Sequence, residues 1–412
     1  MGKNWQVEYE TLFLYIGAPA WALVNGTWSS LAMLATYLPE GYSISAYLLC
    51  ALTLGNMLPF YLGTKTYMYS RHDIAKLMTI IQLIGLLSGI SLALFWDTTF
   101  EIFGTQYSLV LYFLFFCIGA CSASTSLTHY TYVSSFPPLS TTYLSTGMGA
   151  GSMFAGVLAL IQNNLLPTKF WLSLNFTIVA LLYIPSIIAV WRIEEGWEKQ
   201  EALKRRQNDD IDRKGVAHES SSSHSSESKD EGGFASGQEF EEWTVVRNNV
   251  WLLLCVGIAS ALGHGLIPCV ISSLSGRFSL NNETLSFATG EAAVCDPIFR
   301  FYTAYFRFTS RWSIYKATAA LVLIAVAIVV LLELPDSLTI YSTPLGGVVA
   351  VTLNVSFVCL FVFTNTSSFL YLKEKVPPRL VGYAYKWNGM FVQYGAAFGS
   401  LISLILFLLK IL

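Results

Sequence analysis

The chain has 412 residues, of which 54% are hydrophobic and only 12% are charged, and its formal net charge is −2. Since a soluble domain carries about 25% charged residues, this composition excludes an ordinary soluble protein. The small net charge gives no reason to expect nucleic acid as a partner. We therefore expect an all-α protein that crosses a lipid bilayer many times.

Eleven apolar segments are long enough to cross a bilayer as helices. Their approximate bounds are 11–36, 43–64, 74–96, 106–135, 139–162, 170–192, 250–275, 286–306, 314–334, 345–372 and 380–409. Lys and Arg are concentrated in the even-numbered loops and scarce in the odd-numbered ones. By the positive-inside rule, this bias predicts a cytoplasmic N-terminus and an extracellular C-terminus.

The first span, 11–36, combines helix-weakening residues with polar and aromatic ones. Gly17 and Pro19 weaken the helix. Asn25 then offers a donor and an acceptor close to the flat ring of Trp28. Two interpretations stay open: a ligand-binding segment, or a kink with interfacial tryptophans.

A polar segment divides the membrane part into two halves. Residues 194–246 are rich in charge and include the almost entirely polar tract 220–228. Such a segment cannot bury enough apolar surface to fold alone, so we expect a disordered cytoplasmic linker. It separates a six-helix bundle, 1–193, from a five-helix bundle, 247–412. Many secondary transporters consist of two such bundles.

The eighth span carries ionisable residues in an otherwise apolar stretch. Asp296 and Arg300 are four residues apart on a helix, so they can pair. Asp-Pro suits a helix start, which predicts a break at Cys295 and a new helix from Pro297. A purely structural ion pair explains Asp296 and Arg300 as well as a role in transport does.

His264 lies in the seventh span between two glycines, and it could titrate near neutral pH. A buried histidine that makes an interhelical hydrogen bond is the competing interpretation. Our candidates for proton or ion coupling are Glu291, Asp296, Arg300 and His264. Glycines that we expect to allow close helix packing are Gly147, Gly149, Gly151, Gly395 and Gly399.

One glycosylation site and no catalytic motif are expected. Of five N-x-S/T sequons, only the one at Asn282 falls in a predicted outer loop. The sequence has no H-E-x-x-H, no P-loop and no nucleophile elbow, and nothing in it suggests a metal cluster. We therefore expect no enzyme activity, no cofactor and no ATP-driven transport.

The chain resembles the animal riboflavin transporter family in the order and spacing of several short elements. The agreement is strongest through the fifth span. The matching elements are Trp21, Asn25-Gly26-x-Trp28, Leu38-Pro39-Glu40-Gly41-Tyr42-Ser43, Leu54-Gly55-Asn56, Ala120-Cys121, Thr128, Pro137-Pro138, Gly147-x-Gly149, Gly265-Leu266-Ile267-Pro268 and Gln393-x-Gly395. Three positions depart from the family pattern: Ser30 replaces a Glu, Met148 a Gln and Asp296 an Asn.

This resemblance implies uptake of riboflavin across the plasma membrane by alternating access, in a two-bundle fold like those of major facilitator and equilibrative transporters. Riboflavin is uncharged, with a flat ring and a polyhydroxy chain, so it needs aromatic faces and uncharged polar partners. We expect Trp28 to stack on the ring. The expected hydrogen-bonding residues are Asn25, Asn56, Thr128, Asn365 and Gln393. The alternatives are an equilibrative nucleoside transporter or, in another class, a multi-span receptor or scaffold.

Overall fold

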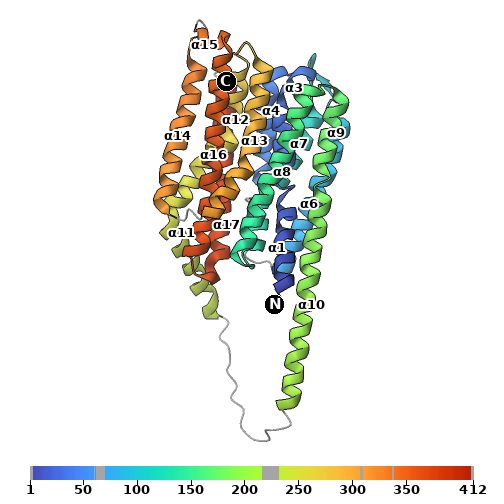
Figure 1. Ribbon diagram of the computed structural model, residues 1–412, viewed down its shortest axis with the longest axis vertical. Coiled ribbons are helices and arrows are strands. Elements are labelled where there is room, and N and C mark those ends of the chain that lie inside the picture. Colours follow the sequence, from blue (N-terminus) through green and yellow to red (C-terminus); the bar gives the residue numbers. More distant parts are fainter. Residues whose placement is uncertain are drawn as a thin grey trace.

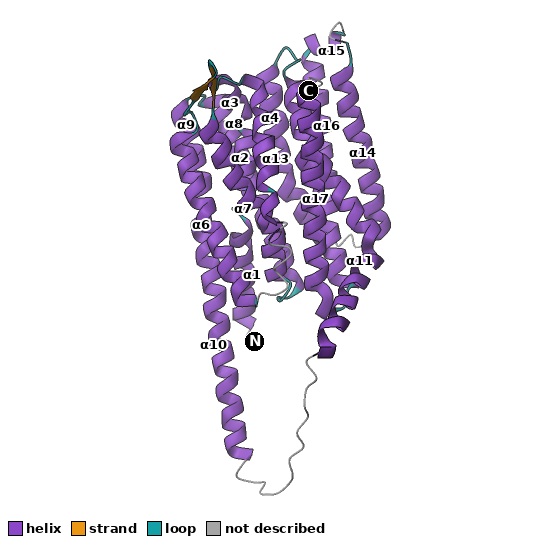
Figure 2. Ribbon diagram, turned by 180° about the vertical axis from the view of Figure 1, so that it is seen from behind, coloured by secondary structure: helices purple, strands orange, loops and turns teal. Residues whose placement is uncertain are grey.

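The computed structural model describes residues 3–59, 61, 70–215, 232–306, 310–335 and 338–409, and they are almost entirely helical (Figures 1 and 2). The helices of the N-terminal half are α1 (Lys3–Gly17), α2 (Ala22–Ser29), α3 (Leu31–Tyr37), η1 (Gly41–Ser43), α4 (Ile44–Gly55), α6 (Arg71–Phe95), α7 (Leu109–Val133), α8 (Pro138–Leu165), α9 (Lys169–Ala180) and α10 (Tyr183–Gly215). Those of the C-terminal half are α11 (Gly232–Ser260), η3 (Ala261–Leu266), α12 (Ile267–Ser275), α13 (Asn281–Phe306), α14 (Arg311–Glu333), α15 (Thr339–Ser342), α16 (Pro344–Lys375), η4 (Pro378–Leu380) and α17 (Val381–Leu408).

The two halves form two bundles that stand side by side, as the blue-to-green and yellow-to-red parts of Figure 1 show. In the first, α1 and α2 pack on α8, and α6 packs on α7 and α9. In the second, α16 packs on α13 and α14, and α11 packs on α17. The bundles meet where α8 runs along α13 and where α7 and α4 contact α17. A site between these helices is therefore built from both halves.

One short β-hairpin joins α6 to α7 at the end of the bundle farthest from the tip of α10 (Figure 2). Strands β1 (Phe100–Ile102) and β2 (Thr105–Tyr107) pair antiparallel through a turn in which Gly104 has φ +81°. Just after the hairpin, Ser108 N donates a hydrogen bond to Glu40 at 2.6 Å, and Tyr112 Oη also donates to Glu40. A carboxylate at the start of a helix satisfies free N–H groups there, so Glu40 anchors α7.

Glycines bring helices into close contact, as the sequence predicts. A Cβ at Gly147 would collide with the backbone of Leu14, and one at Gly151 with the backbone of Ala18, so α1 lies directly on α8. In the other half, a Cβ at Gly399 would collide with the Ala261 carbonyl. Small residues let backbones approach in this way in membrane helices. These glycine faces serve packing.

Within the described residues, nine helices are long and apolar enough to cross a membrane. The two expected spans that are not among them are 11–36 and 286–306. The first is divided into α1, α2 and α3: Pro19, which lacks the N–H that would continue the ladder, lies between α1 and α2, and Ser30 separates α2 from α3. The second lies within α13, where its charged residues lower the hydropathy. The number of eleven spans therefore stays a prediction.

The expected break at Cys295 is wrong: α13 runs continuously from Asn281 to Phe306 with Pro297 inside it. A proline in a helix needs room for its ring on the side of the preceding turn. Gly149 of α8 supplies room beside it, because a Cβ there would lie 2.6 Å from Pro297 Cα. Helix packing therefore overrides the local start signal of Asp-Pro.

The expected disordered linker, 194–246, is helical at both ends. Helix α10 continues to Gly215 and projects beyond the bundle, and α11 begins at Gly232 (Figure 2). The remaining residues, 216–231, lie outside the part of the chain that the structure describes. The first and last parts of the segment 194–246 are therefore helical and not disordered as expected.

Candidate functional site

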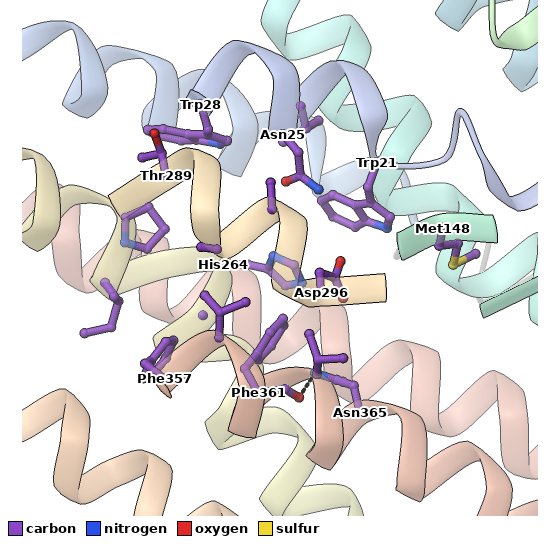
Figure 3. A pocket seen from close by; sticks show the side chains of 18 of the residues that line it. Trp21, Asn25, Trp28, Met148, His264, Thr289, Asp296, Phe357, Phe361 and Asn365 are labelled. Carbon is purple, nitrogen blue, oxygen red and sulfur yellow. Dashed lines mark hydrogen bonds between the residues drawn. The ribbon is translucent and has the colours of Figure 1, made fainter. Parts of the chain in front are cut away.

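A central cavity lies between the two halves (Figure 3). Helices α2, α4, α7 and α8 line it on one side, and η3, α12, α13, α16 and α17 line it on the other. The cavity has a volume of about 190 Å³ and is partly open to the outside. Because both bundles contribute its walls, a movement of one bundle against the other changes the cavity.

Helix α2 and the residue before it present two of the candidate residues, Asn25 and Trp28, together with Trp21 to this cavity. Trp21, Asn25 and Trp28 all line it and are spaced by four and three residues, which places them on one helix face. The break at Pro19 frees α2 from the direction of α1. Figure 3 shows the three side chains along one edge of the cavity, with Trp28 beside Thr289 of α13. The sequence pattern around Asn25 thus identifies one wall of the cavity.

An aromatic contact joins the two halves across the cavity. The Trp21 indole stacks on the His264 imidazole, with ring centroids 4.8 Å apart and an angle of 10° between the planes. His264 in turn meets the ring of Phe361 edge to face, at 4.9 Å and 89°. His264 lies in the π-helical turn η3, a distortion that often occurs at functional sites. The three rings thus place aromatic side chains from both halves in the cavity wall, as binding of an aromatic ligand requires.

Uncharged polar groups face the same space. Asn25 Nδ2 donates to Ser152 Oγ at 2.5 Å, which fixes the amide against α8. Asn365 Nδ2 donates to the Phe361 carbonyl at 3.2 Å, the dashed line in Figure 3. Asn365 Oδ1 is buried and has no hydrogen-bond partner among the described residues. An unpaired buried acceptor is costly, so Asn365 is suited to accept a hydrogen bond from a ligand.

One ion pair lines the cavity. As expected from their spacing, Arg300 Nε donates to Asp296 Oδ1 at 2.6 Å and Nη2 donates to Asp296 Oδ2 at 3.3 Å. The two side chains are only 15% and 11% exposed. They are the two charged side chains among the described residues that line the cavity. No group of three or more His, Cys, Asp or Glu residues in the described ranges is placed to hold a metal ion.

Four candidate residues do not line the cavity. Glu291 is exposed on the surface of α13, so only three of the four coupling candidates remain at the cavity. Thr128 donates to the Ser124 carbonyl at 2.9 Å within α7, and Gln393 donates to the Ala123 carbonyl at 3.1 Å. Asn56 is buried at the end of α4. The bonds of Thr128 and Gln393 stabilise helices and helix packing.

Much of the wall that α16 supplies was not predicted from the sequence. Asn354, Phe357, Phe361, Asn365 and Phe369 all line the cavity. They recur at intervals of three or four residues, which is the signal of one helix face. The signal is weak because α16 is apolar on nearly all sides, so its cavity face does not differ from its lipid face in hydropathy.

Contacts between the halves lie at one end of the cavity, near the turn between α7 and α8. The rings of Tyr130 and Phe369 stack there with centroids 3.9 Å apart and 7° between their planes. Beyond them, Lys373 Nζ donates to the carbonyls of Ser134 and Phe136, at 3.1 and 3.2 Å. These contacts join α16 to the turn between α7 and α8.

The opposite end also has contacts between the halves. Tyr42 Oη donates to Asn282 Oδ1 at 2.5 Å. Asn163 Nδ2 donates to Ser286 Oγ at 3.2 Å, which joins α8 to the first turns of α13. Asn282, the expected glycosylation site, is exposed at this end. The cavity therefore lies between two sets of contacts that join the halves.

Sequence comparison identifies related proteins. The family described as "Solute carrier family 52, riboflavin transporter" matches residues 6–169 and 163–410. Member 3-A from Danio rerio is 28% identical over 148 residues, which cover 35% of this chain and 33% of the relative. Riboflavin transporter rft-1 from Caenorhabditis elegans is 26% identical over 171 residues, covering 40% and 38%. Human member 2 is 26% identical over 151 residues, covering 37% and 34%. The matched segments thus span about a third of the length of these curated relatives.

Solved structures share the fold. A proton:xylose symporter of the major facilitator superfamily, bound to a bromodeoxyglucose, superposes with a TM-score of 0.60 at 13% identity, covering 99% of this chain and 90% of that one. A partially occluded, inward-open xylose transporter from E. coli gives a TM-score of 0.56 at 11% identity, covering 99% and 100%. The two bundles thus have the arrangement of a major facilitator transporter.

Proposed function

Because this chain belongs to solute carrier family 52, the riboflavin transporters, we propose that it carries riboflavin across a membrane and binds it in the central cavity. The family and the fold are those of transporters and not of enzymes. The observation that carries the proposal is the combination of tryptophan faces with uncharged amides in a space that both bundles enclose.

The chemistry of riboflavin matches this lining. Its flat, uncharged ring gains from stacking on an indole, and Trp28 lines the cavity at the end of α2. Its hydroxyl groups need small polar partners, which Asn25, Thr289 and the unpaired oxygen of Asn365 supply. A nucleoside also combines a flat base with hydroxyl groups, so it is the competitor to compare.

Alternating access follows from the contacts at the two ends. Each end is held by a few hydrogen bonds, and the Lys373 end also by the stack of Tyr130 on Phe369. A typical hydrogen bond contributes only about 1 kcal/mol. Binding of a ligand that contacts α2 and α16 together can therefore shift the equilibrium between opening at one end and opening at the other. Release of the Lys373 contacts opens the cavity on one side, and release of Tyr42 and Asn163 opens it on the other.

We place the protein in the plasma membrane, with the N-terminus and the Lys373 end in the cytoplasm. The concentration of basic residues in even-numbered loops supports this orientation. It also puts Asn282 outside the cell, where a glycan could be attached. A shift in electrophoretic mobility after glycosidase treatment, absent in Asn282→Gln, is the expected result, and an unchanged wild-type mobility contradicts it.

The proposed substrate is tested by uptake of radiolabelled riboflavin into cells that express the chain. We expect saturable uptake that excess riboflavin or lumiflavin blocks and that uridine or adenosine does not. Uptake blocked by nucleosides instead would identify a nucleoside carrier. No uptake above background, with surface expression confirmed, would contradict transport of riboflavin.

A further inference from the structure

The Asp296–Arg300 ion pair is the one feature of the cavity that an uncharged ligand does not require. The cavity otherwise presents rings, amides and hydroxyl groups. Placing two charges in a membrane protein interior is costly even when they are paired. Two apolar side chains would have filled the same space without that cost, so the pair has to be explained by what it does in the cavity.

The guanidinium of Arg300 is bound along one edge only. Nε and Nη2 donate to the two oxygens of Asp296, while Nη1 donates to no other group in the described part of the chain. A guanidinium presents five N–H donors, so donors remain beyond those that Asp296 occupies. Arg300 lies close enough to Tyr130 and His264 to interact with both electrostatically, and both of these residues line the cavity.

A guanidinium fork binds carboxylate and phosphate in the same bidentate geometry. Asp296 therefore occupies the place that a phosphate group of a ligand would take. Its negative charge also cancels the positive charge of Arg300, so the described lining carries no net charge from Asp, Glu, Lys or Arg. A phosphorylated ligand meets a carboxylate where it would need a free cation.

We propose that Asp296 determines substrate charge specificity: by occupying Arg300, it makes the cavity select uncharged riboflavin and reject its 5′-phosphate ester. This inference rests on the proposed function, since it concerns the same cavity. Without Asp296, the fork of Arg300 is free and the cavity gains an unpaired cation. With both residues neutral, the cavity again has no charge to offer a phosphate.

Packing holds the pair in a fixed position. Asp296 and Pro297 adjoin each other on α13, and a Cβ at Gly149 would lie 2.9 Å from Pro297 Cβ and 3.0 Å from Arg300 Cδ. Helix α8 thus packs closely against the ring of Pro297 and the Cδ atom of Arg300. Arg300 therefore cannot move toward α8 at this point, and since it lines the cavity, we expect the guanidinium to stay at the cavity when Asp296 is substituted.

The test measures equilibrium binding of riboflavin and of riboflavin 5′-phosphate to the purified full chain in lipid nanodiscs, by quenching of flavin fluorescence. The quantity compared is the ratio of the two dissociation constants. We expect wild type to favour riboflavin and Asp296→Asn to shift the ratio toward the phosphate by about ten-fold or more, as for a charge-assisted hydrogen bond. The double variant Asp296→Asn with Arg300→Gln should lose that gain.

If Asp296→Asn does not fold, the single variant Arg300→Gln provides an independent test of the proposal. It leaves the carboxylate and removes the cation, so binding of the phosphate ester should fall further relative to riboflavin. The matched control is Glu291→Gln, which also removes one carboxylate from α13 but lies outside the cavity. Its ratio should equal that of wild type.

The outcomes separate this inference from the proposed function. If wild type binds no riboflavin, the proposed function is wrong. If wild type binds riboflavin but its phosphate ester equally well, or if Asp296→Asn leaves the ratio unchanged, the function stands and the role of Asp296 is contradicted. An increase in phosphate binding in Arg300→Gln would also overturn it.

Discussion

The ring of Trp21 lies flat on the ring of His264, with centroids 4.8 Å apart, although the two residues belong to opposite halves of the chain. Both line the cavity, and Phe361, which also lines it, meets the histidine ring edge to face. This stack connects the broken first span to the π-helical turn of the seventh. A movement of α2 therefore displaces the contact with His264 in the C-terminal bundle.

His264 is expected to act as a flat ring that stacks. His264→Phe should retain most of the uptake, because it keeps both ring contacts. His264→Ala should raise KM by roughly 2- to 10-fold, the equivalent of an aromatic pair of about 0.5–1.5 kcal/mol. Uptake by the three proteins is measured across a range of external pH. If His264→Phe instead abolished uptake, or removed a pH dependence present in wild type, a proton-carrying role would be indicated.

Trp28 is expected to supply the main stacking surface for the ligand. Trp28→Ala should weaken riboflavin binding by about 1–3 kcal/mol, the value of ring stacking on an aromatic side chain, which is roughly a 5- to 150-fold rise in Kd. Trp28→Phe should lose less binding free energy than Trp28→Ala. The matched control is Trp251→Ala, since Trp251 is 70% exposed on α11 and outside the cavity. Equal affinity in Trp28→Ala and Trp251→Ala would remove Trp28 from the site.

Gly151 is expected to matter for stability, whatever the ligand. Its missing Cβ lets α8 touch the backbone of Ala18, so Gly151→Val should destabilise the protein by about 1–3 kcal/mol through overpacking. The readout is the thermal unfolding temperature of the protein in detergent. Gly382→Ala is the control, because the nearest atom to a Cβ there is Ser134 Oγ at 3.5 Å. A Gly151→Val protein as stable as the control would show that the close contact is not needed.

Lys373 is expected to hold the cytoplasmic end closed. Lys373→Ala removes two hydrogen bonds from a charged group to the Ser134 and Phe136 carbonyls, and bonds of this kind contribute about 1.5–3 kcal/mol each. The fraction of protein molecules whose cavity is open at the Lys373 end should therefore rise. The measurement is the labelling rate of Met148→Cys, a cavity position, by a membrane-impermeant thiol reagent in a cysteine-free background. Lys316→Ala, at an exposed position of α14, is the control. Equal labelling in both variants would argue against a closing role for Lys373.

The sequence predicts the cavity wall made by α2 better than the wall made by α16. Asn25 and Trp28 stand out because an amide and an indole are rare beside Gly and Pro in a membrane helix. The phenylalanines of α16 do not stand out, since apolar residues also face lipid. Gln393 and Thr128 looked similar to Asn365 in sequence, yet only Asn365 lines the cavity, whereas Gln393 and Thr128 donate to backbone carbonyls of α7 outside it. Hydrogen-bond partners are decided by tertiary packing, which local patterns do not contain.

The eighth span also shows that local sequence patterns do not contain tertiary contacts. The pairing of Asp296 with Arg300 follows from helical spacing and is confirmed. The continuity of α13 through Pro297 depends on Gly149, which is almost 150 residues away in sequence and belongs to the other half. No local signal around Pro297 could reveal that contact.

The most direct test of the central claim is riboflavin counterflow in proteoliposomes that contain the purified chain. Liposomes loaded with unlabelled riboflavin should accumulate external radiolabelled riboflavin transiently, and Trp28→Ala proteoliposomes should not at the same external concentration. This result would show that the cavity between the bundles is the path of the flavin. Counterflow that is equal in wild type and Trp28→Ala, or absent from wild type protein that is folded and inserted, would contradict the account.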